Sequence, residues 1–216
     1  MKEIILLGGR GNGTVIASVI EDINKVKPTY KIIGFLNDNE EIGSYINDYP
    51  VLGKISKEEC EKYPNAYFIY SLISVGKAPK RIEKLKALAI PSEKWINIYH
   101  PSVVIGSHCK IGKGVILMPN VIISPNASIG DFTQIYGNSI VGHDTKIGNY
   151  CFISNSSSIG SFIDAGEGVH IGSNSTIRER AKLGDYSLIG MGSIVLQDTE
   201  PYSKNVGVPS KNIGRI

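Results

Sequence analysis

The sequence has little cysteine and no long hydrophobic run. Cys60, Cys109 and Cys151 are odd in number and show no C-x-x-C or Cys/His spacing, which argues against a disulfide framework and a structural zinc site. The longest apolar run near the beginning, residues 4–7, is far shorter than a signal-peptide core or the ~20 residues that cross a bilayer. We therefore expect reduced thiols and a cytoplasmic protein.

An excess of one charge is also missing. Lys and Arg number 23 against 20 Asp and Glu, and no strongly basic run occurs. A protein that binds nucleic acid without sequence preference needs concentrated positive charge to release counterions. The 216 residues suffice for one large domain or two small ones. We expect the partner to be a small molecule or another protein, and neither a nucleic acid nor a membrane.

A six-residue repeat dominates the second half of the chain. From Ile105 onward an aliphatic residue, here called the leader, returns at every sixth position for fifteen hexads. The next residue is glycine in ten of these hexads, and the residue four after the leader is always small or β-branched. The leaders are Ile105, Ile111, Leu117, Ile123, Ile129, Ile135, Val141, Ile147, Ile153, Ile159, Ala165, Ile171, Ile177, Leu183, Ile189 and Val195. Such a fixed period is typical of a solenoid.

A hexad with one large and one small inward residue suits a short strand followed by a turn. Three hexads close a triangular coil of eighteen residues, so fifteen hexads make five coils. Successive coils lie one strand spacing, ~4.8 Å, apart, and their leaders form interior columns. Glycine after the leader is expected to supply the backbone geometry of a tight corner. We therefore predict a hexapeptide-repeat parallel β-helix.

The first 97 residues follow a different pattern. In order, they predict a strand, a glycine loop, a helix and a strand at residues 4–7, 8–13, 14–26 and 31–36. A strand, a helix and a strand follow at residues 67–73, 80–88 and 95–98. We predict a small α/β domain with a parallel sheet over residues 1–97, which binds ligands at the carboxyl ends of its strands, and the β-helix over residues 98–216.

The glycine loop is a candidate phosphate site. It follows a strand and opens a helix, the setting in which backbone N–H groups hold a phosphate. Its spacing is not the dinucleotide fingerprint, because Thr14 stands at the last glycine position, and it is not a Walker A motif. Asp38, after the next strand, could accept hydrogen bonds from a ribose or a base. The alternative is that the glycines only allow close strand–helix packing and that Asp38 lies on a solvated turn.

His143 is the histidine with a catalytic setting. Of four histidines it alone lies at a turn in the middle of the repeats beside a carboxylate, Asp144. Histidine titrates near neutral pH and can act as a general base. Eighteen residues on, Ser161 occupies the same corner, where its backbone N–H could face an oxyanion. The alternative for His143 is a solvated turn residue.

Two further groups of residues carry weaker signals. Cys109 and Cys151 fall at the inward position four after a leader, so we expect them to fill the core. Basic residues gather late in the chain and could meet the phosphates of an acyl carrier or simply be solvated. They are Arg178, Arg180, Lys182, Lys204, Lys211 and Arg215.

Nearly the whole chain resembles the NeuD/PglD-type sugar acetyltransferases of the hexapeptide-repeat acyltransferase superfamily. The hexads indicate the superfamily, and the order of a glycine-loop domain, an Asn-x-x-His-Pro-Ser join and a Gly-His-Asp turn indicates this branch. The segments that carry the resemblance are residues 5–13, 34–38, 97–102, 141–144, 189–195 and 206–211.

The resemblance implies a Rossmann-like domain on a left-handed β-helix, a homotrimer with active sites between subunits, and direct transfer without a metal. It implies His143 as the base and Asp144 as its acidic neighbour. It places a nucleotide-linked amino sugar at Gly9, Gly11, Asn12, Gly13, Asn37 and Asp38. It places acetyl-CoA, the co-substrate, at Gly160, Ser161, Ile171, Gly190 and Lys211.

Three positions depart from the family pattern. Family members often carry His where this chain has Asn12 and Phe152, and Asn where it has Tyr136. Asparagine can still bond a sugar hydroxyl, but phenylalanine cannot. These departures bear on the placement of the sugar and on the choice of acyl group, and not on the base.

The leading hypothesis is acetyl-CoA-dependent N-acetylation of a UDP- or dTDP-linked 4-amino sugar in bacterial surface polysaccharide or glycan biosynthesis. The alternatives are a sugar O-acetyltransferase of the sialic-acid type and a non-catalytic β-helix scaffold. A histidine at the base position disfavours the scaffold.

Overall fold

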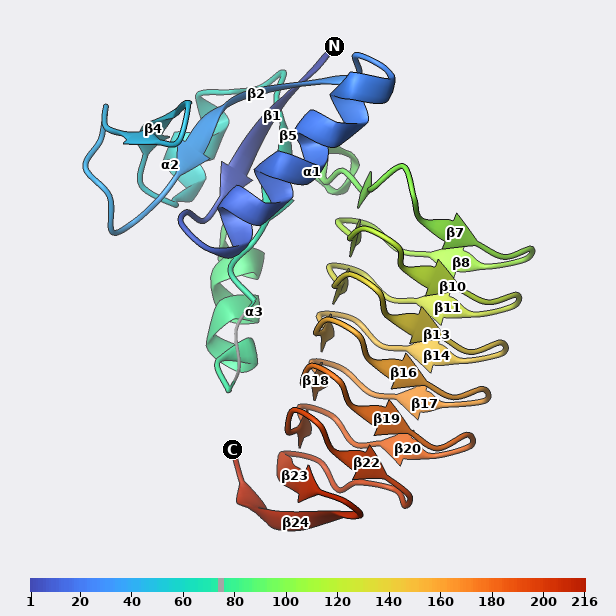
Figure 1. Cartoon of the computed structure of the whole chain (residues 1–216). Coiled ribbons are helices and arrows are strands. Elements are labelled where there is room, and N and C mark those ends of the chain that lie inside the picture. The colour runs from blue at the N-terminus through green and yellow to red at the C-terminus, as the bar shows by residue number, and fades with distance from the viewer. Residues whose placement is uncertain (74–75) are drawn as a thin grey trace.

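The chain folds into an α/β domain beside a column of stacked coils (Figure 1). The structure is a computed structural model and describes residues 1–73 and 76–216. The fold class expected from the sequence, a Rossmann-like α/β domain followed by a left-handed parallel β-helix, is confirmed. Across the described residues, no helix combines the length and the apolar character that spanning a membrane requires.

The α/β domain is built around β1, whose last four residues are fully buried. Its strands are β1 (Lys2–Leu7), β2 (Tyr30–Leu36), β3 (Tyr45–Ile46), β4 (Tyr49–Gly53) and β5 (Tyr67–Tyr70). Its helices are α1 (Asn12–Val26), α2 (Lys57–Glu61), α3 (Ala78–Ala87) and the 3₁₀ turn η1 (Ser92–Lys94). The sheet order is β3-β4-β2-β1-β5, and all pairs are parallel except β3 with β4.

The expected strand at residues 95–98 is wrong. Trp95 makes only an isolated bridge to Phe68, and Ile98 begins β6 (Ile98–Tyr99), which pairs with the coils. The reason is that Tyr99 sits six residues before the first leader and packs against the β-helix core, so the six-residue repeat begins one unit earlier. The hairpin β3–β4 and helix α2 were not predicted, and β5 ends at Tyr70, before residue 73.

The coils consist of two-residue strands at every predicted hexad. After β6 these are β7 (Val104–Ile105), β8 (Lys110–Ile111), β9 (Ile116–Leu117), β10 (Ile122–Ile123), β11 (Ser128–Ile129), β12 (Gln134–Ile135), β13 (Ile140–Val141), β14 (Lys146–Ile147), β15 (Phe152–Ile153), β16 (Ser158–Ile159), β17 (Asp164–Ala165), β18 (His170–Ile171), β19 (Thr176–Ile177), β20 (Lys182–Leu183), β21 (Leu188–Ile189) and β22 (Ile194–Val195). The chain ends in the antiparallel pair β23 (Ser203–Gly207) and β24 (Ser210–Arg215).

Every third strand joins the same sheet, so the prism has three faces. The face of β7, β10, β13, β16, β19 and β22 is called face 1, and that of β8, β11, β14, β17 and β20 face 2. Face 3 holds β6, β9, β12, β15, β18 and β21, followed by β23 and β24. Partners are eighteen residues apart, as Ile123 and Val141 are, and the leaders form the buried columns that the period predicts.

Some of the small inward residues carry a hydroxyl or a thiol, and these polar groups are buried in the core. The Thr133 hydroxyl donates to the Gly148 carbonyl at 2.8 Å, and that of Thr145 donates to Gly160 at 2.9 Å. The Cys151 thiol makes the same contact at 3.2 Å and is 1% exposed, which confirms it as core filler. Each of these three buried donors is thus satisfied by a backbone carbonyl of the next coil.

The expected role of the glycines after the leaders is wrong. None of them has a positive φ; that conformation belongs to the residue three after the leader, such as Asp144 with φ 56°. A Cβ at Gly142 would lie 2.5 Å from the carbonyl carbon of Gly160, and one at Gly148 would lie 2.4 Å from the Gly166 oxygen. Glycine is required there because the backbone of the next coil passes directly against it.

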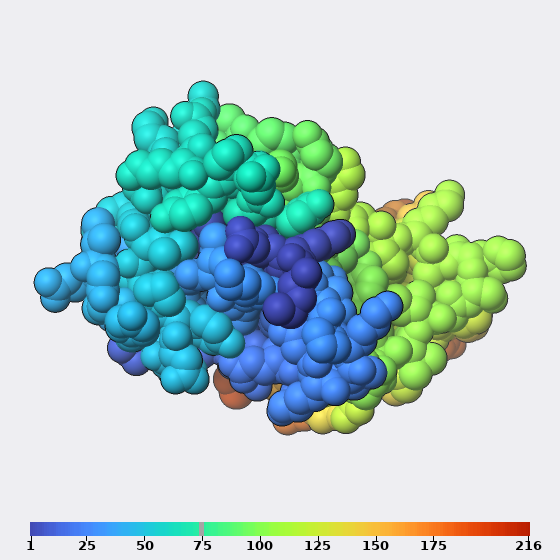
Figure 2. Space-filling view, turned by 90° about the horizontal axis from the view of Figure 1, so that it is seen from above, coloured from blue at the N-terminus to red at the C-terminus, as the bar shows by residue number. Residues whose placement is uncertain are grey.

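The α/β domain is anchored on face 3. The Gln134 side-chain amide donates to the Tyr70 carbonyl at the end of β5 at 2.8 Å, and Gln134 is fully buried. Met118 and Tyr136 belong to the same apolar cluster as the core of the α/β domain. Seen from above, the α/β domain covers one side of the column, and the turns of the early coils extend beyond it (Figure 2).

Gly148→Ala is expected to lower the free energy of unfolding by about 1–3 kcal/mol, because a Cβ cannot fit against the neighbouring coil. Gly137→Ala is the matched control, since its Cβ would come no closer than 3.1 Å to another atom. Chemical denaturation of both variants checks this. Equal losses would show that coil contact does not set the requirement for glycine.

Candidate active site

His143 and Asp144 form a pair on the turn between β13 and β14, at the edge where faces 1 and 2 meet. The His143 Nδ1 lies 2.7 Å from Asp144 Oδ2. Because an ionised carboxylate only accepts hydrogen bonds, Nδ1 carries the proton and Nε2 presents a lone pair. Half of the His143 side chain is exposed, and Nε2 makes no hydrogen bond to a described residue. This arrangement can accept a proton from a bound molecule.

The turn itself brings the two side chains together. Asp144 adopts the left-handed conformation, which aspartate tolerates better than most residues, and its backbone N–H donates to the Pro125 carbonyl at 3.1 Å. The His143 carbonyl accepts from Phe162 N–H at 3.1 Å. The backbone on both sides is therefore tied to the coils before and after it.

Ser161 lies where the sequence placed it. A Cβ on Gly142 would come within 2.6 Å of the Ser161 nitrogen, so this amide packs against the residue before His143. In the part of the chain that the structure describes, the Ser161 N–H donates no hydrogen bond. An unpaired amide beside an imidazole that can accept a proton suits stabilisation of an oxyanion.

The other expected coenzyme residues do not gather there. Gly190 follows a strand of face 3, at a different edge of the prism from Ser161, and Lys211 is exposed on β24. Ile171 is 1% exposed and points into the core, so a side-chain role for it in coenzyme binding is wrong. Within one subunit the set is divided between two edges.

The glycine loop opens α1 in a conformation that suits an anion. Gly11 is the N-cap of α1 at φ 88°, where no side chain caps the helix, and no acidic residue occupies the first turn. The free N–H groups of such a turn attract negative charge. Arg81 of α3 lines the same open pocket as Gly9, Gly11, Asn12 and Gly13.

The close-packing role of these glycines is equally real. A Cβ on Gly9 would lie 2.0 Å from the Asn37 side-chain nitrogen, and one on Gly13 would lie 3.1 Å from the Phe35 ring. Asn12 donates to the Ile73 carbonyl at 3.2 Å. The close-packing alternative is therefore confirmed, and the phosphate site stays a prediction.

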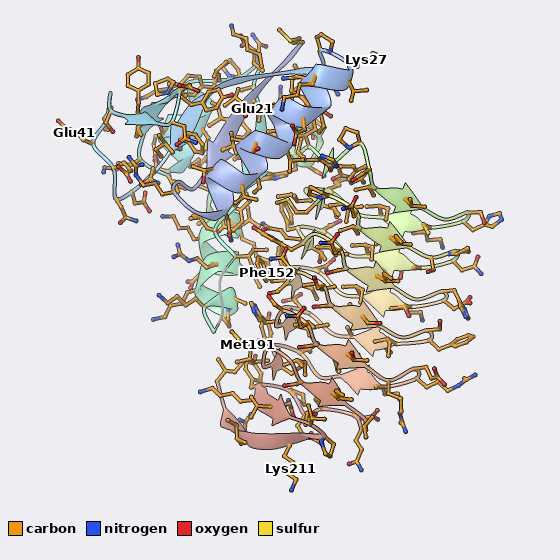
Figure 3. All side chains as sticks on the ribbon, viewed as in Figure 1. Glu21, Lys27, Glu41, Phe152, Met191 and Lys211 are labelled. Carbon is orange, nitrogen blue, oxygen red and sulfur yellow. The ribbon has the colours of Figure 1, made fainter. Side chains whose placement is uncertain are left out.

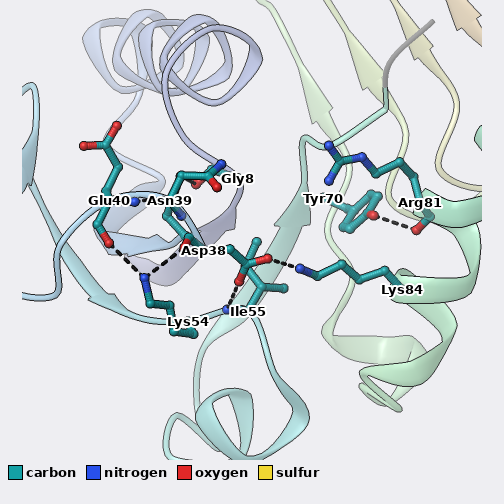
Figure 4. A network of polar contacts seen from close by, with 10 residues as sticks. Gly8, Asp38, Asn39, Glu40, Lys54, Ile55, Tyr70, Arg81 and Lys84 are labelled. Atoms are coloured by element: carbon teal, nitrogen blue, oxygen red, sulfur yellow. Dashed lines mark hydrogen bonds and ion pairs between the residues drawn. The ribbon is translucent and has the colours of Figure 1, made fainter. Parts of the chain in front are cut away.

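Asn37 and Asp38 are engaged within the protein. Asn37 is buried; it donates to the Gly8 carbonyl at 2.9 Å and accepts from two backbone N–H groups of the following turn. Asp38 accepts from Ile55 N–H at 2.9 Å and pairs with Lys84 (Figure 4). Partial burial opposes ionisation, but Lys84 and the Ile55 amide hold the pKa of Asp38 below its usual value. Asn37 is buried and fully engaged within the protein, whereas the Asp38 carboxylate is paired but 40% exposed, so its contact with a ribose stays a prediction.

His143 and the glycine loop are not brought together within one chain. The loop between β1 and α1 lies above α3, on the side of face 3, whereas the turn between β13 and β14 projects away from the α/β domain (Figure 1). A site that uses both requires a second copy.

The departures from the family pattern lie on face 3 and at its edge. Phe152 lies between the coils and α3 (Figure 3) and stacks on His170 at 5.0 Å. Tyr136 is buried, and neither its hydroxyl nor the side-chain oxygen of Gln134 has a described hydrogen-bond partner. Burial raises the pKa of Tyr136, so its phenol is neutral.

Two features near His143 were missed by the sequence analysis. Asn126 contacts Asp144, and the Phe162 ring meets the His143 ring edge-on at 5.1 Å. Both stand eighteen residues from Asp144, one coil away. The eighteen-residue period of the coils therefore predicts both neighbours, but only if residues at that spacing from Asp144 are looked for in the sequence.

Both domains match known families. Residues 3–88 match the PglD N-terminal domain, and residues 96–172 match the GMPPB C-terminal domain. No curated protein sequence matches the chain. The matches support the predicted resemblance to the NeuD/PglD-type proteins, which is confirmed.

Solved structures share this fold over its whole length. A histidine-to-asparagine mutant of perosamine N-acetyltransferase from Caulobacter crescentus, in complex with CoA and GDP-perosamine, is 20% identical with a TM-score of 0.86, covering 99% of this chain and 98% of that one. WeeI from Acinetobacter baumannii is 21% identical, with a TM-score of 0.81 and coverage of 98% and 100%. The acetyltransferase domain of PglB from Neisseria gonorrhoeae, in complex with acetyl coenzyme A, is 18% identical, with a TM-score of 0.64 and coverage of 98% and 99%.

His170 is expected to make stability depend on pH. Burial lowers its pKa from 6.5 to about 4, so the unfolded chain binds a proton there before the folded chain does. The stabilisation is complete above pH 6.5 and is lost as the pH falls toward 4. In His170→Phe, which keeps a stacked ring, unfolding free energies measured between pH 4 and 7 should show a weaker slope. Parallel slopes in the two proteins would contradict this.

Proposed function

We propose that the protein transfers the acetyl group of acetyl-CoA to the amino group of a nucleotide-linked sugar, with His143 as general base. The observation that carries the proposal is the pair itself: an exposed imidazole with its Nδ1 proton held by Asp144 and Nε2 open. The shared fold supports the same reaction, since similar proteins were solved with CoA, acetyl coenzyme A or GDP-perosamine.

The transfer needs only a base and a positioned thioester. The amine nitrogen attacks the thioester carbonyl carbon while His143 Nε2 takes a proton from the amine. The carbonyl oxygen gains negative charge, and we assign its stabilisation to the Ser161 N–H, whose nitrogen packs against Gly142 beside His143. As the C–N bond is completed, the C–S bond breaks, and the imidazolium returns the proton to the leaving thiolate. The products are the amide and free CoA, and no covalent enzyme intermediate forms.

The nucleotide is assigned to the glycine loop. A diphosphate there would meet the N-terminus of α1 and the Arg81 side chain that lines the same pocket. Asp38 acts indirectly in this assignment, because its ion pair with Lys84 ties the end of β2 to α3. A UDP- or dTDP-linked sugar stays a prediction. GDP-linked sugars should be assayed beside them as substrates, because two similar structures hold GDP-perosamine. The product would enter bacterial surface glycan synthesis.

The complete site is assigned to the contact between copies of the chain in a homotrimer. One subunit supplies His143, and its neighbour supplies the glycine loop, since one chain holds them on different sides. An aliphatic column on the outside of face 1 favours such a contact. Val104, Ile122 and Ile140 stack in register and are 38–56% exposed, a pattern unusual for a solvated sheet.

Replacing the base tests the reaction. His143→Ala should reduce thiol release from acetyl-CoA by about 10²–10⁴-fold on the amino sugar that the native protein uses, because general base catalysis contributes that much. His108→Ala is the control: His108 is exposed on a turn of the same edge but has no carboxylate partner among the described residues. Equal turnover by His143→Ala would remove His143 from the mechanism. Turnover of a hydroxyl sugar alone would favour O-acetylation, and no turnover with any sugar would favour the scaffold.

Replacing the aliphatic column tests the assembly. Ile140→Asp places a charge in the column and should convert the trimer to monomers, with loss of turnover, as measured by light scattering and thiol release. Lys110→Glu, on face 2, changes a charge without touching the column and should leave the trimer intact. A native protein that is monomeric and active would contradict the shared site.

A further inference from the structure

The His143–Asp144 pair lies in a column of turn residues that repeats every eighteen positions. Asn126, Asp144, Phe162 and Arg180 occupy the same place in four successive coils at the edge between faces 1 and 2. All four have the left-handed conformation, with φ between 56° and 64°. Side chains in this column therefore stand directly before and after the pair.

The residue before the pair holds the carboxylate. The Asn126 side-chain nitrogen donates to Asp144 Oδ1 at 3.2 Å, while His143 Nδ1 donates to Oδ2 at 2.7 Å. The two donors bind different oxygens, so rotation of the carboxylate would break both bonds. Asn126 is itself fixed through its backbone N–H, which donates to the Ser107 carbonyl at 3.0 Å.

The residue after the pair holds the imidazole. The Phe162 ring stands at 84° to the His143 ring with their centroids 5.1 Å apart. The Phe162 ring also contacts Arg180, whose guanidinium lies 4.6 Å from the ring centroid. This cation–π contact restricts the ring that touches His143.

We propose that Asn126 and Phe162 are positioning residues for the base: Asn126 orients Asp144 so that the proton stays on His143 Nδ1, and Phe162 sets the plane of the imidazole. Together they aim Nε2 at the incoming amine. This inference rests on the proposed function and extends it to residues that touch neither substrate.

Few charged side chains surround His143, so the effect of one added charge on its protonation can be measured. The turn before it, residues 124–127, and the turn after it, residues 160–163, contain no titratable side chain. Asp144 is bonded to the ring, and Arg180 stands behind Phe162. A new carboxylate at position 126 would favour the imidazolium and would also repel Asp144.

The chain offers a matched control for Asn126. Asn120, on the edge between faces 3 and 1, has φ 61° and donates from its side-chain nitrogen to the Asn138 side-chain oxygen at 3.1 Å. It is the same type of residue in the same conformation, with the same bond to the next coil, but it has no catalytic neighbour. A variant that lacks this bond therefore shows how much the loss of such a bond between coils changes activity when no catalytic residue is involved.

The experiment compares Asn126→Gly with Asn120→Gly, since glycine keeps the left-handed backbone in both. Asn126→Gly should lower kcat about tenfold, the usual effect of losing a hydrogen bond to a charged group, with little change in the KM for acetyl-CoA. Asn120→Gly should leave kcat unchanged. Equal kcat losses, or a loss confined to KM, would overturn the proposal.

Two further variants separate positioning from folding. Asn126→Asp should move the acid limb of the kcat–pH profile to higher pH, whereas Asn120→Asp should not. Phe162→Leu keeps an apolar contact but loses the edge-on ring, and should lower kcat in a folded trimer. If the acid limb does not move in Asn126→Asp, the role of Asn126 is contradicted. If kcat is unchanged in Phe162→Leu, the role of Phe162 is contradicted.

A titration that needs no substrate keeps this inference distinct from the proposed function. The NMR signal of the His143 ring proton, identified by its loss in His143→Ala, should titrate at higher pH in Asn126→Asp than in the native protein. If no sugar is turned over but this shift occurs, the transferase proposal fails and the positioning stands. If turnover is normal and the shift is absent, the positioning by Asn126 fails alone.

Discussion

The close approach of each coil to the next is the constraint on which this molecule depends. Backbone hydrogen bonds join residues about eighteen apart, and glycines such as Gly142 and Gly148 let the next backbone pass where a Cβ would lie. Because the coils cannot slide against one another, each turn residue has a fixed neighbour one coil before and one after it. Columns of side chains along the edges are the direct consequence, and the proposed site is a segment of one such column.

This geometry makes an exposed turn into a rigid place for chemistry. His143 and Asp144 lie on a surface turn, yet backbone bonds to Pro125 and Phe162 hold that turn to the coils around it. A base on a mobile loop would lose much of its advantage, because the reacting atoms must be held close to their final geometry. The same rigidity leaves the imidazole facing outward, away from the glycine loop of its own chain, which is why the proposed site is shared between two copies.

The α/β domain positions the glycine loop relative to the coils. Its buried contact with face 3, through Gln134 and the end of β5, holds the glycine loop at a fixed height beside the coils. Asn37 is bonded to the loop and Asp38 is paired with Lys84 of α3, so both side chains help to hold the proposed nucleotide pocket in shape. Asn37 therefore fixes the first residue of the loop, and the N-terminus of α1 beyond it has no side-chain cap.

The amino-acid sequence by itself determined the repeat, the positions of the coil strands, the order of the domains and the pair His143–Asp144, because a strict period and adjacent residues are local properties of a chain. Only the tertiary structure showed that glycine follows the leaders because the next coil passes close to it, and that Ile171 points inward. Only the tertiary structure showed that Asp38 pairs with Lys84 and that Asn126 and Phe162 flank the pair His143–Asp144. It also decided that the glycine loop and His143 lie apart in one chain. These facts depend on contacts between residues distant in sequence, whose partners no local pattern names.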